Sequence, residues 1–340
     1  IWLWSYVEGK SQDIESKGSN WVRILEGIPA STLMAGDISG DGNLEIIALF
    51  PGQGLWYYSI LTTSWSSIVG DASGVELFTL AKTSASGPVQ VIASFSTTGL
   101  RKWTFNGSWT TLMAVEAETL AAGNVDRDTD SIDELLVAFK GYDSLYVYTF
   151  ATGKFNRIIE VSPSQIRAAD ITGDGYIEMV CVFDGYGIYM VRYLPDKNED
   201  MKAFSGDTAK FDLVNDIPYN HEWVSMNKSG KGFQFNRITW GTPDAGHHVA
   251  TGDIAGHEGK NVIFTYMNKT YYYSYDTKGW STLVEAPMKR IITGKFTDGA
   301  KDDVIGCETV SGSIYLRRTS TGTWEPIVAN GNTNAMASLE

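Results

Sequence analysis

An acidic loop that recurs along the chain constrains its fold more than any other sequence feature. In the clearest copy, residues 36–47, oxygen-bearing side chains stand at alternate positions, and an apolar run follows the last of them. These side chains belong to Asp37, Ser39, Asp41, Asn43 and Glu45. Calcium takes six to eight oxygen ligands at flexible distances, and a tight loop of alternating acids supplies them. The loop starts like an EF-hand loop, but it closes sooner and leads into a strand pattern instead of a helix.

Two more copies of this loop strengthen the prediction of calcium over that of a polar Asp-Gly turn. One copy matches almost residue for residue, and its ligand positions hold Asp170, Thr172, Asp174, Tyr176 and Glu178. The other is two residues longer, and its candidates are Asn124, Asp126, Asp128 and Asp130, with Asp133 or Glu134 closing the loop. So many neighbouring carboxylates repel one another without a cation. The sequence therefore predicts structural Ca²⁺ in three loops.

Weaker copies of the loop complete a repeat. Aligned on the position of Asp37, the matches are Asp37, Lys82, Asn124, Asp170, Asp216, Asp253 and Lys295. We expect no strong ion site at 253, where a carboxylate is missing, and none at 82, where no carboxylate remains. At 295 a lysine replaces the first ligand, and its ammonium could take the place of the ion.

The segments around each loop read as four short strands. A short strand precedes the loop, a β-branched apolar run follows it, and an aromatic strand comes next. The fourth strand often opens on an aromatic residue, as at Trp65, Trp109, Phe155, Trp280 and Trp324. Four strands in roughly 43 residues, with turn signals between them, are typical of a β-propeller blade. The predicted fold class is therefore all-β, a propeller of four-stranded antiparallel blades.

The two ends of the chain predict how the ring closes. Residues 1–25 read as two strands joined by a polar loop, and residues 332–340 contain a first strand. Pairing them in one blade would close the ring without a free edge. With seven complete copies, this favours eight blades in a single domain, residues 1–340, with seven blades as the alternative. The chain opens inside a strand-like run, which is compatible with removal of a leader peptide.

Composition limits the partners and the compartment. Lys and Arg number 27 against 40 Asp and Glu, for a net charge of -13, which argues against nucleic acid or an anionic membrane as partner. No apolar run reaches the roughly 18 residues of a membrane span. Cys181 and Cys307 both lie in apolar strand patterns, so we expect two buried free thiols instead of a disulfide.

No motif for catalysis emerges, and an enzyme is the less favoured reading. Nucleophile-elbow, P-loop and dinucleotide patterns are missing, and the His247-His248 pair lacks a third zinc ligand in the sequence. The aromatic residues that recur at one blade position indicate packing between blades. Trp223 and Trp240 break the repeat within the irregular stretch 194–245, so they are the candidate ligand-binding residues.

The loop Asp-x-Ser/Thr-Gly-Asp-Gly-x-x-Glu, followed by an apolar and an aromatic strand, resembles the FG-GAP/VCBS-type repeats. Such calcium-loop blades occur in integrin α-subunit propellers, some mushroom propeller lectins and many secreted bacterial proteins. In that family the positions of Asn43 and Tyr176 typically offer a backbone carbonyl. The resemblance implies a secreted or cell-surface recognition protein that binds carbohydrate, like a lectin, or an extracellular protein partner. The alternative is a propeller polysaccharide lyase or glycoside hydrolase.

Overall fold

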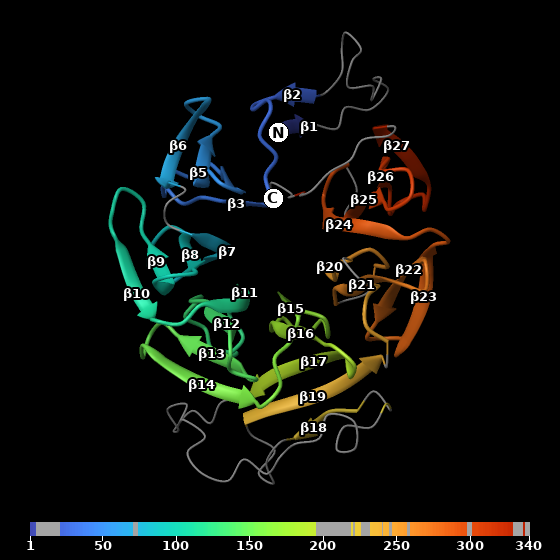
Figure 1. The fold of residues 1–340 in the computed structure, drawn as a ribbon. Coiled ribbons are helices and arrows are strands. Elements are labelled where there is room, and N and C mark those ends of the chain that lie inside the picture. Colours follow the sequence, from blue (N-terminus) through green and yellow to red (C-terminus); the bar gives the residue numbers. More distant parts are fainter. Residues whose placement is uncertain are drawn as a thin grey trace. The chain divides into compact units, whose positions relative to one another are not determined.

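The computed structural model describes residues 1–4, 21–70, 74–194, 219, 222–225, 232–239, 241–244, 247–256, 259–297, 301–328 and 336. Within these residues every regular element is a β-strand, and the strands form an all-β propeller of four-stranded antiparallel blades (Figure 1). None of the described residues belongs to a helix long and apolar enough to cross a membrane. Cys181 and Cys307 are buried free thiols, as predicted.

The chain forms two compact units, each holding three blades. Unit 1 comprises Ile1–Ala35, Leu44–Asp71 and Pro243–Glu340. Its blades are β3 (Thr32–Gly36), β4 (Glu45–Phe50), β5 (Gly54–Ser59) and β6 (Ser64–Val69); β20 (Ala250–Gly252), β21 (Asn261–Tyr266), β22 (Lys269–Ser274) and β23 (Gly279–Val284); and β24 (Met288–Gly294), β25 (Asp303–Glu308), β26 (Ile314–Arg317) and β27 (Trp324–Val328). A two-stranded sheet pairs β1 (Trp2–Trp4) with β2 (Trp21–Arg23).

Unit 2 comprises Gly36–Asn43 and Ala72–Thr242. Its blades are β7 (Val75–Ala81), β8 (Gln90–Phe95), β9 (Gly99–Trp103) and β10 (Trp109–Met113); β11 (Ala117–Gly123), β12 (Glu134–Phe139), β13 (Leu145–Thr149) and β14 (Lys154–Ile159); and β15 (Gln165–Ala169), β16 (Glu178–Phe183), β17 (Gly187–Leu194) and β19 (Gly232–Thr239). The last blade carries a fifth strand, β18 (Val224–Ser225), on its outer edge. The expectation of a single domain stays a prediction.

The described residues form six blades, so the prediction of eight blades, with seven as alternative, is wrong. One of the two surplus blades was the blade split between the termini, and the other comes from the stretch after β17. This strand pairs directly with β19, from Leu194 against Gly232 to Ile188 against Thr239, so residues 195–231 are an insertion inside one blade. The interval from Asp170 to Asp253 is nearly twice the repeat period. The spacing of the repeats therefore predicted an extra blade in this interval. The copy aligned at Asp216 lies outside the described residues.

The predicted closure of the ring lies mostly outside the described residues too. Residues 1–25 supply β1 and β2, which pair antiparallel from Trp2 against Arg23 to Trp4 against Trp21, as expected for two strands joined by a loop. The proposed partner segment, 332–340, is described at residue 336 alone. Its pairing with the N-terminal strands stays a prediction.

The second strand of each blade lies in the core because a propeller packs both faces of its sheets. Every residue of β4, β12 and β16 is buried. In unit 2 one cluster joins the β11–β14 blade to the β15–β19 blade through side chains such as Leu136, Val147, Cys181 and Tyr189. These strands are β-branched and apolar on both faces, as the sequence pattern predicted.

The aromatic residue that opens the fourth strand packs inside its own blade. The Trp280 ring lies 4.8 Å from that of Phe264 and 5.2 Å from that of Tyr273, measured between ring centroids. Phe155 lies in the same way against Phe139 and Tyr148, at 5.4 and 4.5 Å. The prediction of a packing role is confirmed for these rings, but their contacts hold the outer strand to the inner strands of one sheet.

Candidate metal centre

The loop between β15 and β16 is folded by its first aspartate. The two carboxylate oxygens of Asp170 accept hydrogen bonds from the amides of Gly173 and Gly175, at 2.7 and 2.9 Å. Both glycines have φ near +80°, a conformation that few other residues adopt without strain. Asp37 makes the same two bonds in its own loop, at 2.6 and 3.0 Å. The two loops therefore share one backbone shape.

A polar residue at the start of the second strand closes each loop. One carboxylate oxygen of Glu178 accepts hydrogen bonds from the amides of Ile171 and Thr172, at 3.0 and 3.4 Å. Glu134 makes the equivalent bonds in the β11–β12 loop, at 3.1 and 3.4 Å. In the β20–β21 loop the neutral amide oxygen of Asn261 accepts the equivalent hydrogen bonds, from the amides of Ile254 and Ala255, at 3.1 and 3.0 Å. Closing the loop therefore needs an acceptor at this position, but it does not need a charge.

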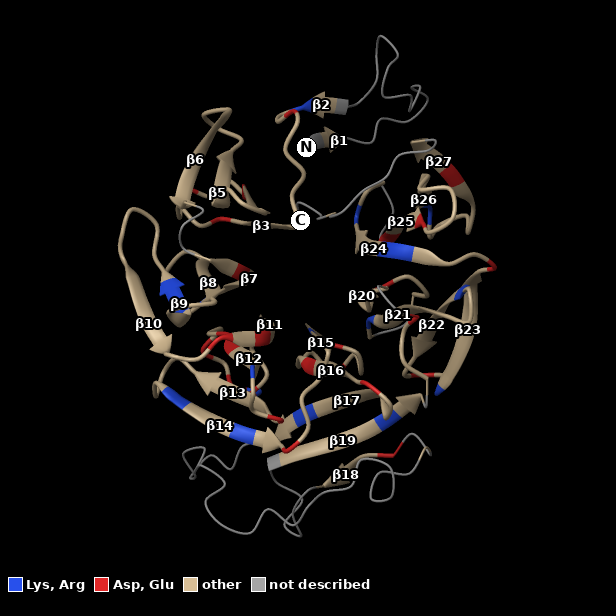
Figure 2. Cartoon of the chain, in the orientation of Figure 1, with Lys and Arg blue, Asp and Glu red and all other residues tan. Residues whose placement is uncertain are grey.

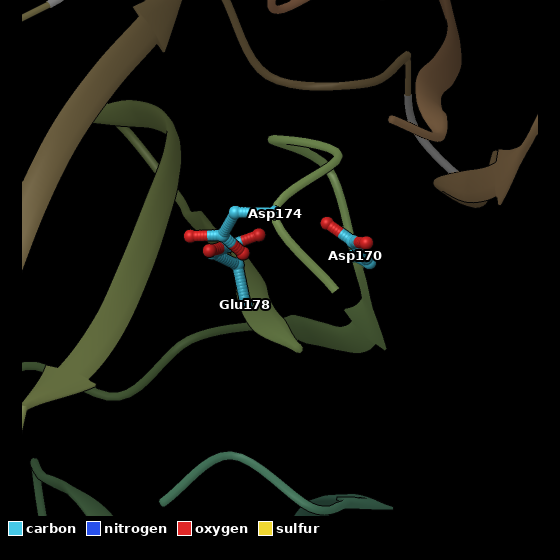
Figure 3. A group of neighbouring side chains, drawn as sticks. All are labelled: Asp170, Asp174 and Glu178. Atoms are coloured by element: carbon cyan, nitrogen blue, oxygen red, sulfur yellow. The ribbon is translucent and has the colours of Figure 1, made fainter. Parts of the chain in front are cut away.

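Three carboxylates converge in the β15–β16 loop. Asp170, Asp174 and Glu178 each place an oxygen within 4.8 Å of the others, the single such group among the described residues (Figure 3). Glu178 is fully buried, and this burial is the main cause that raises its pKa, with the charge of Asp174 adding to it. The hydroxyl of Thr172 donates to Glu178 at 3.3 Å. These are hard oxygen donors without His or Cys, a set that suits calcium.

A protein cation already contacts this group. Nη2 of Arg127 lies 2.9 Å from Oδ2 of Asp174 and 3.0 Å from Oε1 of Glu178. Its guanidinium carbon lies 4.7 Å from the centre of the Tyr176 ring. Sequence reasoning missed this residue, although the alignment shows an arginine where the copies at 37 and 170 carry glycine.

The acids of the β11–β12 loop do not converge. The side-chain oxygens of Asp126, Asp128 and Asp130 each accept a hydrogen bond from the amide two residues later, at 3.1, 3.0 and 2.7 Å. Burial raises the pKa of Asp126 to about 6 and, together with the nearby charge of Asp126, raises the pKa of Glu134 to about 9. Acidic positions, drawn red, lie along the ribbon around β11 and β12 (Figure 2). Oδ1 of Asn124 is buried without a hydrogen-bond partner among the described residues. A cation would supply that partner and relieve the repulsion between neighbouring carboxylates, so these residues fit an ion.

Of the two candidates to close the β11–β12 loop, Glu134 bonds to the amides of Val125 and Asp126, whereas Asp133 bonds to the amide of Asn124 and to the neighbouring blade. Oδ2 of Asp133 accepts from the amide of Lys82 at 2.7 Å, and the Asp133 amide donates to the Lys82 carbonyl at 2.8 Å. Asp302 makes the same pair of bonds with Asp253, at 2.8 and 2.9 Å. The aspartate that precedes the second strand, Asp133 or Asp302, therefore connects the loop of its blade to the blade before it.

In the loop at 37, Asp37 and Asp41 accept hydrogen bonds from residues of their own loop. Asp41 accepts hydrogen bonds from the amide and the side chain of Asn43, at 2.8 and 3.1 Å, and these bonds lower its pKa. Ser39 lies within 3.4 Å of Asp37. Glu45 is buried at the start of β4. The predicted ligands are thus present in a loop of the same shape as the one at 170.

The structure gives the tryptophan and histidine candidates different surroundings. Trp223 precedes β18 and is half-buried, and the guanidinium carbon of Arg192 lies 4.1 Å from its ring centre. Trp240 lies outside the described residues. The ring nitrogens of His247 lie 3.1 Å from the Asp244 carbonyl and 2.8 Å from the Thr309 hydroxyl. His247 thus has the contacts of a buried structural histidine.

Comparison with known proteins identifies the fold. No family model and no curated protein sequence matches the chain. Among solved structures, the complex of BBS1N with ARL6DN soaked with lead aligns at a TM-score of 0.53 and 9% identity, over 93% of this chain and 83% of that one. The mercury-soaked complex aligns at 0.54 and 10% identity, over 86% and 81%. FG-GAP/VCBS membership is not confirmed, and the chain has in common with these structures a β-propeller fold.

Proposed function

We propose that the chain is a recognition propeller without catalytic activity, stabilised by calcium in its acidic loops. The proposal of a calcium site rests on the convergence of the Asp170, Asp174 and Glu178 carboxylates, whose oxygens lie within 4.8 Å of one another. Calcium suits them because all donors are oxygens in a loop whose glycines permit adjustment. The loops at 37 and 124 are proposed as further sites, on the shared shape of the first and on the unpartnered Asn124 oxygen in the second.

Recognition of a partner is supported by side chains exposed at equivalent turns. The turn between the second and third strands exposes Tyr142 and Tyr186 in two blades of unit 2. The same turn exposes Met267 and Val310 in two blades of unit 1, and Val310 is 85% exposed. Repetition at one kind of turn distinguishes these side chains from scattered surface residues. BBS1N, a propeller of similar fold, is seen with a protein partner, which agrees with recognition as the role.

Two classes of ligand follow from the sequence and the resemblance. Carbohydrate was the first expectation, through Trp223 and Trp240 as stacking platforms, and an extracellular protein the second. The Arg192 guanidinium lies over one face of Trp223, which leaves that face without room for a sugar ring. We therefore favour a protein partner and a secreted or cell-surface location. Binding of a glycan is the alternative that the assays below must exclude.

Calorimetric titration with calcium tests the metal centre. Asp170→Asn should remove one binding event, because it replaces a converging carboxylate by an amide. Asp253→Asn is the matched control, because Asp253 makes the same bond to a loop glycine, Gly256, at 3.1 Å, in a loop without the acid group. The control should bind calcium like the wild type. A wild-type protein that binds no calcium, with no shift in melting temperature when EDTA is added, would contradict the proposed metal.

A pair of assays with the calcium-loaded protein tests the recognition role. Polysaccharides incubated with it should keep their length, since no catalytic group has been located among the described residues. New reducing ends or unsaturated uronates would instead support the lyase or hydrolase alternative. A glycan array should give no calcium-dependent binding if the partner is a protein. Strong binding there, lost in Trp223→Ala, would reverse our preference between the two ligands.

A further inference from the structure

Arg127 has a backbone conformation that an arginine rarely adopts. Its φ is +62°, in the left-handed region, where the equivalent residues of the loops at 37, 170 and 253 are Gly40, Gly173 and Gly256, with φ between +74° and +79°. A side chain in this region is strained against its own backbone. The loop therefore holds an arginine where glycine would fold more easily, which calls for a compensating role of its side chain.

The side chain of Arg127 leaves its own acidic loop and enters the next one. Although Asp126 and Asp128 flank it in the chain, its Nη2 binds Asp174 and Glu178 at 2.9 and 3.0 Å. The arginine side chain is 15% exposed and that of Glu178 is fully buried, so their contact is shielded from water, whereas Asp174 is 38% exposed. Its Nε is buried and has no hydrogen-bond partner among the described residues. The guanidinium is thus held by its two ion pairs, but one of its hydrogen-bond donors lacks an acceptor. This favours its exchange for a better-matched cation.

The guanidinium bridges two of the three converging acids. In the loop at 37, the counterpart of Asp174 is Asp41, which accepts hydrogen bonds from the amide and the side chain of Asn43. In the loop at 170, Asp174 likewise accepts from the amide of Tyr176, at 3.1 Å, and is 38% exposed, but it has a further partner in the guanidinium, which also bonds to the buried Glu178. Arg127 is therefore placed where it neutralises the same carboxylates that would bind an ion.

We propose that Arg127 is a tethered cation that competes with calcium for the loop at 170–178. When calcium enters, the Arg127 side chain leaves Asp174 and Glu178, because two cations cannot share these oxygens. The negative charge of the loop is reduced in both states, and its calcium affinity is set by the cost of displacing the arginine. This inference rests on the proposed calcium binding. It adds that a residue of the neighbouring blade regulates this site.

Arg127→Gln tests the competition, because it removes the charge and keeps a polar, although shorter, side chain at the strained backbone position. We expect the calcium affinity of one site to rise on the order of tenfold, or one binding event to appear that the wild type lacks. The gain should vanish in Arg127→Gln combined with Asp174→Asn. Without calcium, Arg127→Gln should melt at a lower temperature than the wild type, and saturating calcium should remove that difference.

The matched control is Arg157→Gln, which removes an arginine paired with Glu160 at 2.9 Å on the outer strand of the same blade. It should leave every calcium affinity unchanged. If the wild type binds calcium and Arg127→Gln binds it with the same affinity and stoichiometry, the competition is refuted while the metal centre stands. If neither protein binds calcium, both proposals fail.

Discussion

At the scale of single residues, acids of similar position have different roles. Glu134 and Glu178 accept hydrogen bonds from their own loops, whereas Asp133 bonds to the backbone of Lys82 in the blade before it. Asn261 closes its loop with a neutral amide. A hydrogen-bond acceptor at this position therefore shapes the loop. Its negative charge is not needed for that shape, and burying the charge is favourable only when a cation binds to it.

This division of roles predicts how substitutions of Glu134 behave. In EDTA, Glu134→Ala should lower the free energy of unfolding by about 1–3 kcal/mol, because the buried amide of Val125 loses its acceptor. Glu134→Gln should unfold at no lower urea concentration than the wild type, since its amide oxygen can accept as that of Asn261 does. In calcium, Glu134→Gln should lose the stabilisation that the ion provides. Equal destabilisation by both variants in EDTA would mean that the charge itself is needed.

At the scale of elements, the blade is held together by aromatic side chains at its outer strand. Trp65 packs against Phe50 and Tyr58, with ring centroids 5.5 and 5.3 Å apart, and its indole nitrogen donates to the carbonyl of Ile24 at 3.1 Å. Trp280 is packed in the same way against the second and third strands of its sheet. Because the outer strand has a neighbouring strand on only one side in most blades, these ring contacts supply much of its attachment.

Substitution of Trp280 measures this attachment. Trp280→Ala should lower the free energy of unfolding by about 3–5 kcal/mol, as for other large aromatic truncations in a packed site. Trp280→Phe should cost clearly less, because Phe155 fills the equivalent position in the β11–β14 blade. Urea denaturation followed by tryptophan fluorescence and by circular dichroism gives both values. If the alanine variant is as stable as the wild type, the ring does not anchor the strand.

At the scale of the whole molecule, the blade is the unit in which the sequence repeats. Six blades place an acidic or polar loop after the first strand and a turn after the second. The loops tie neighbouring blades together, through Asp133 with Lys82 in unit 2 and Asp302 with Asp253 in unit 1. An ion bound in one loop would therefore stabilise the junction of two blades as well as its own turn.

The sequence by itself determined the fold class, the blade pattern and the candidate metal ligands. Strand periodicity and turn residues are local properties, and the sequence displays them directly. The number of blades needed the tertiary structure, because an insertion between β17 and β19 has nearly the length of a repeat and only strand pairing reveals it. The role of Arg127 needed it too. Its partners Asp174 and Glu178 lie about fifty residues away in the chain, and the packing of adjacent blades brings these charges within 3.0 Å.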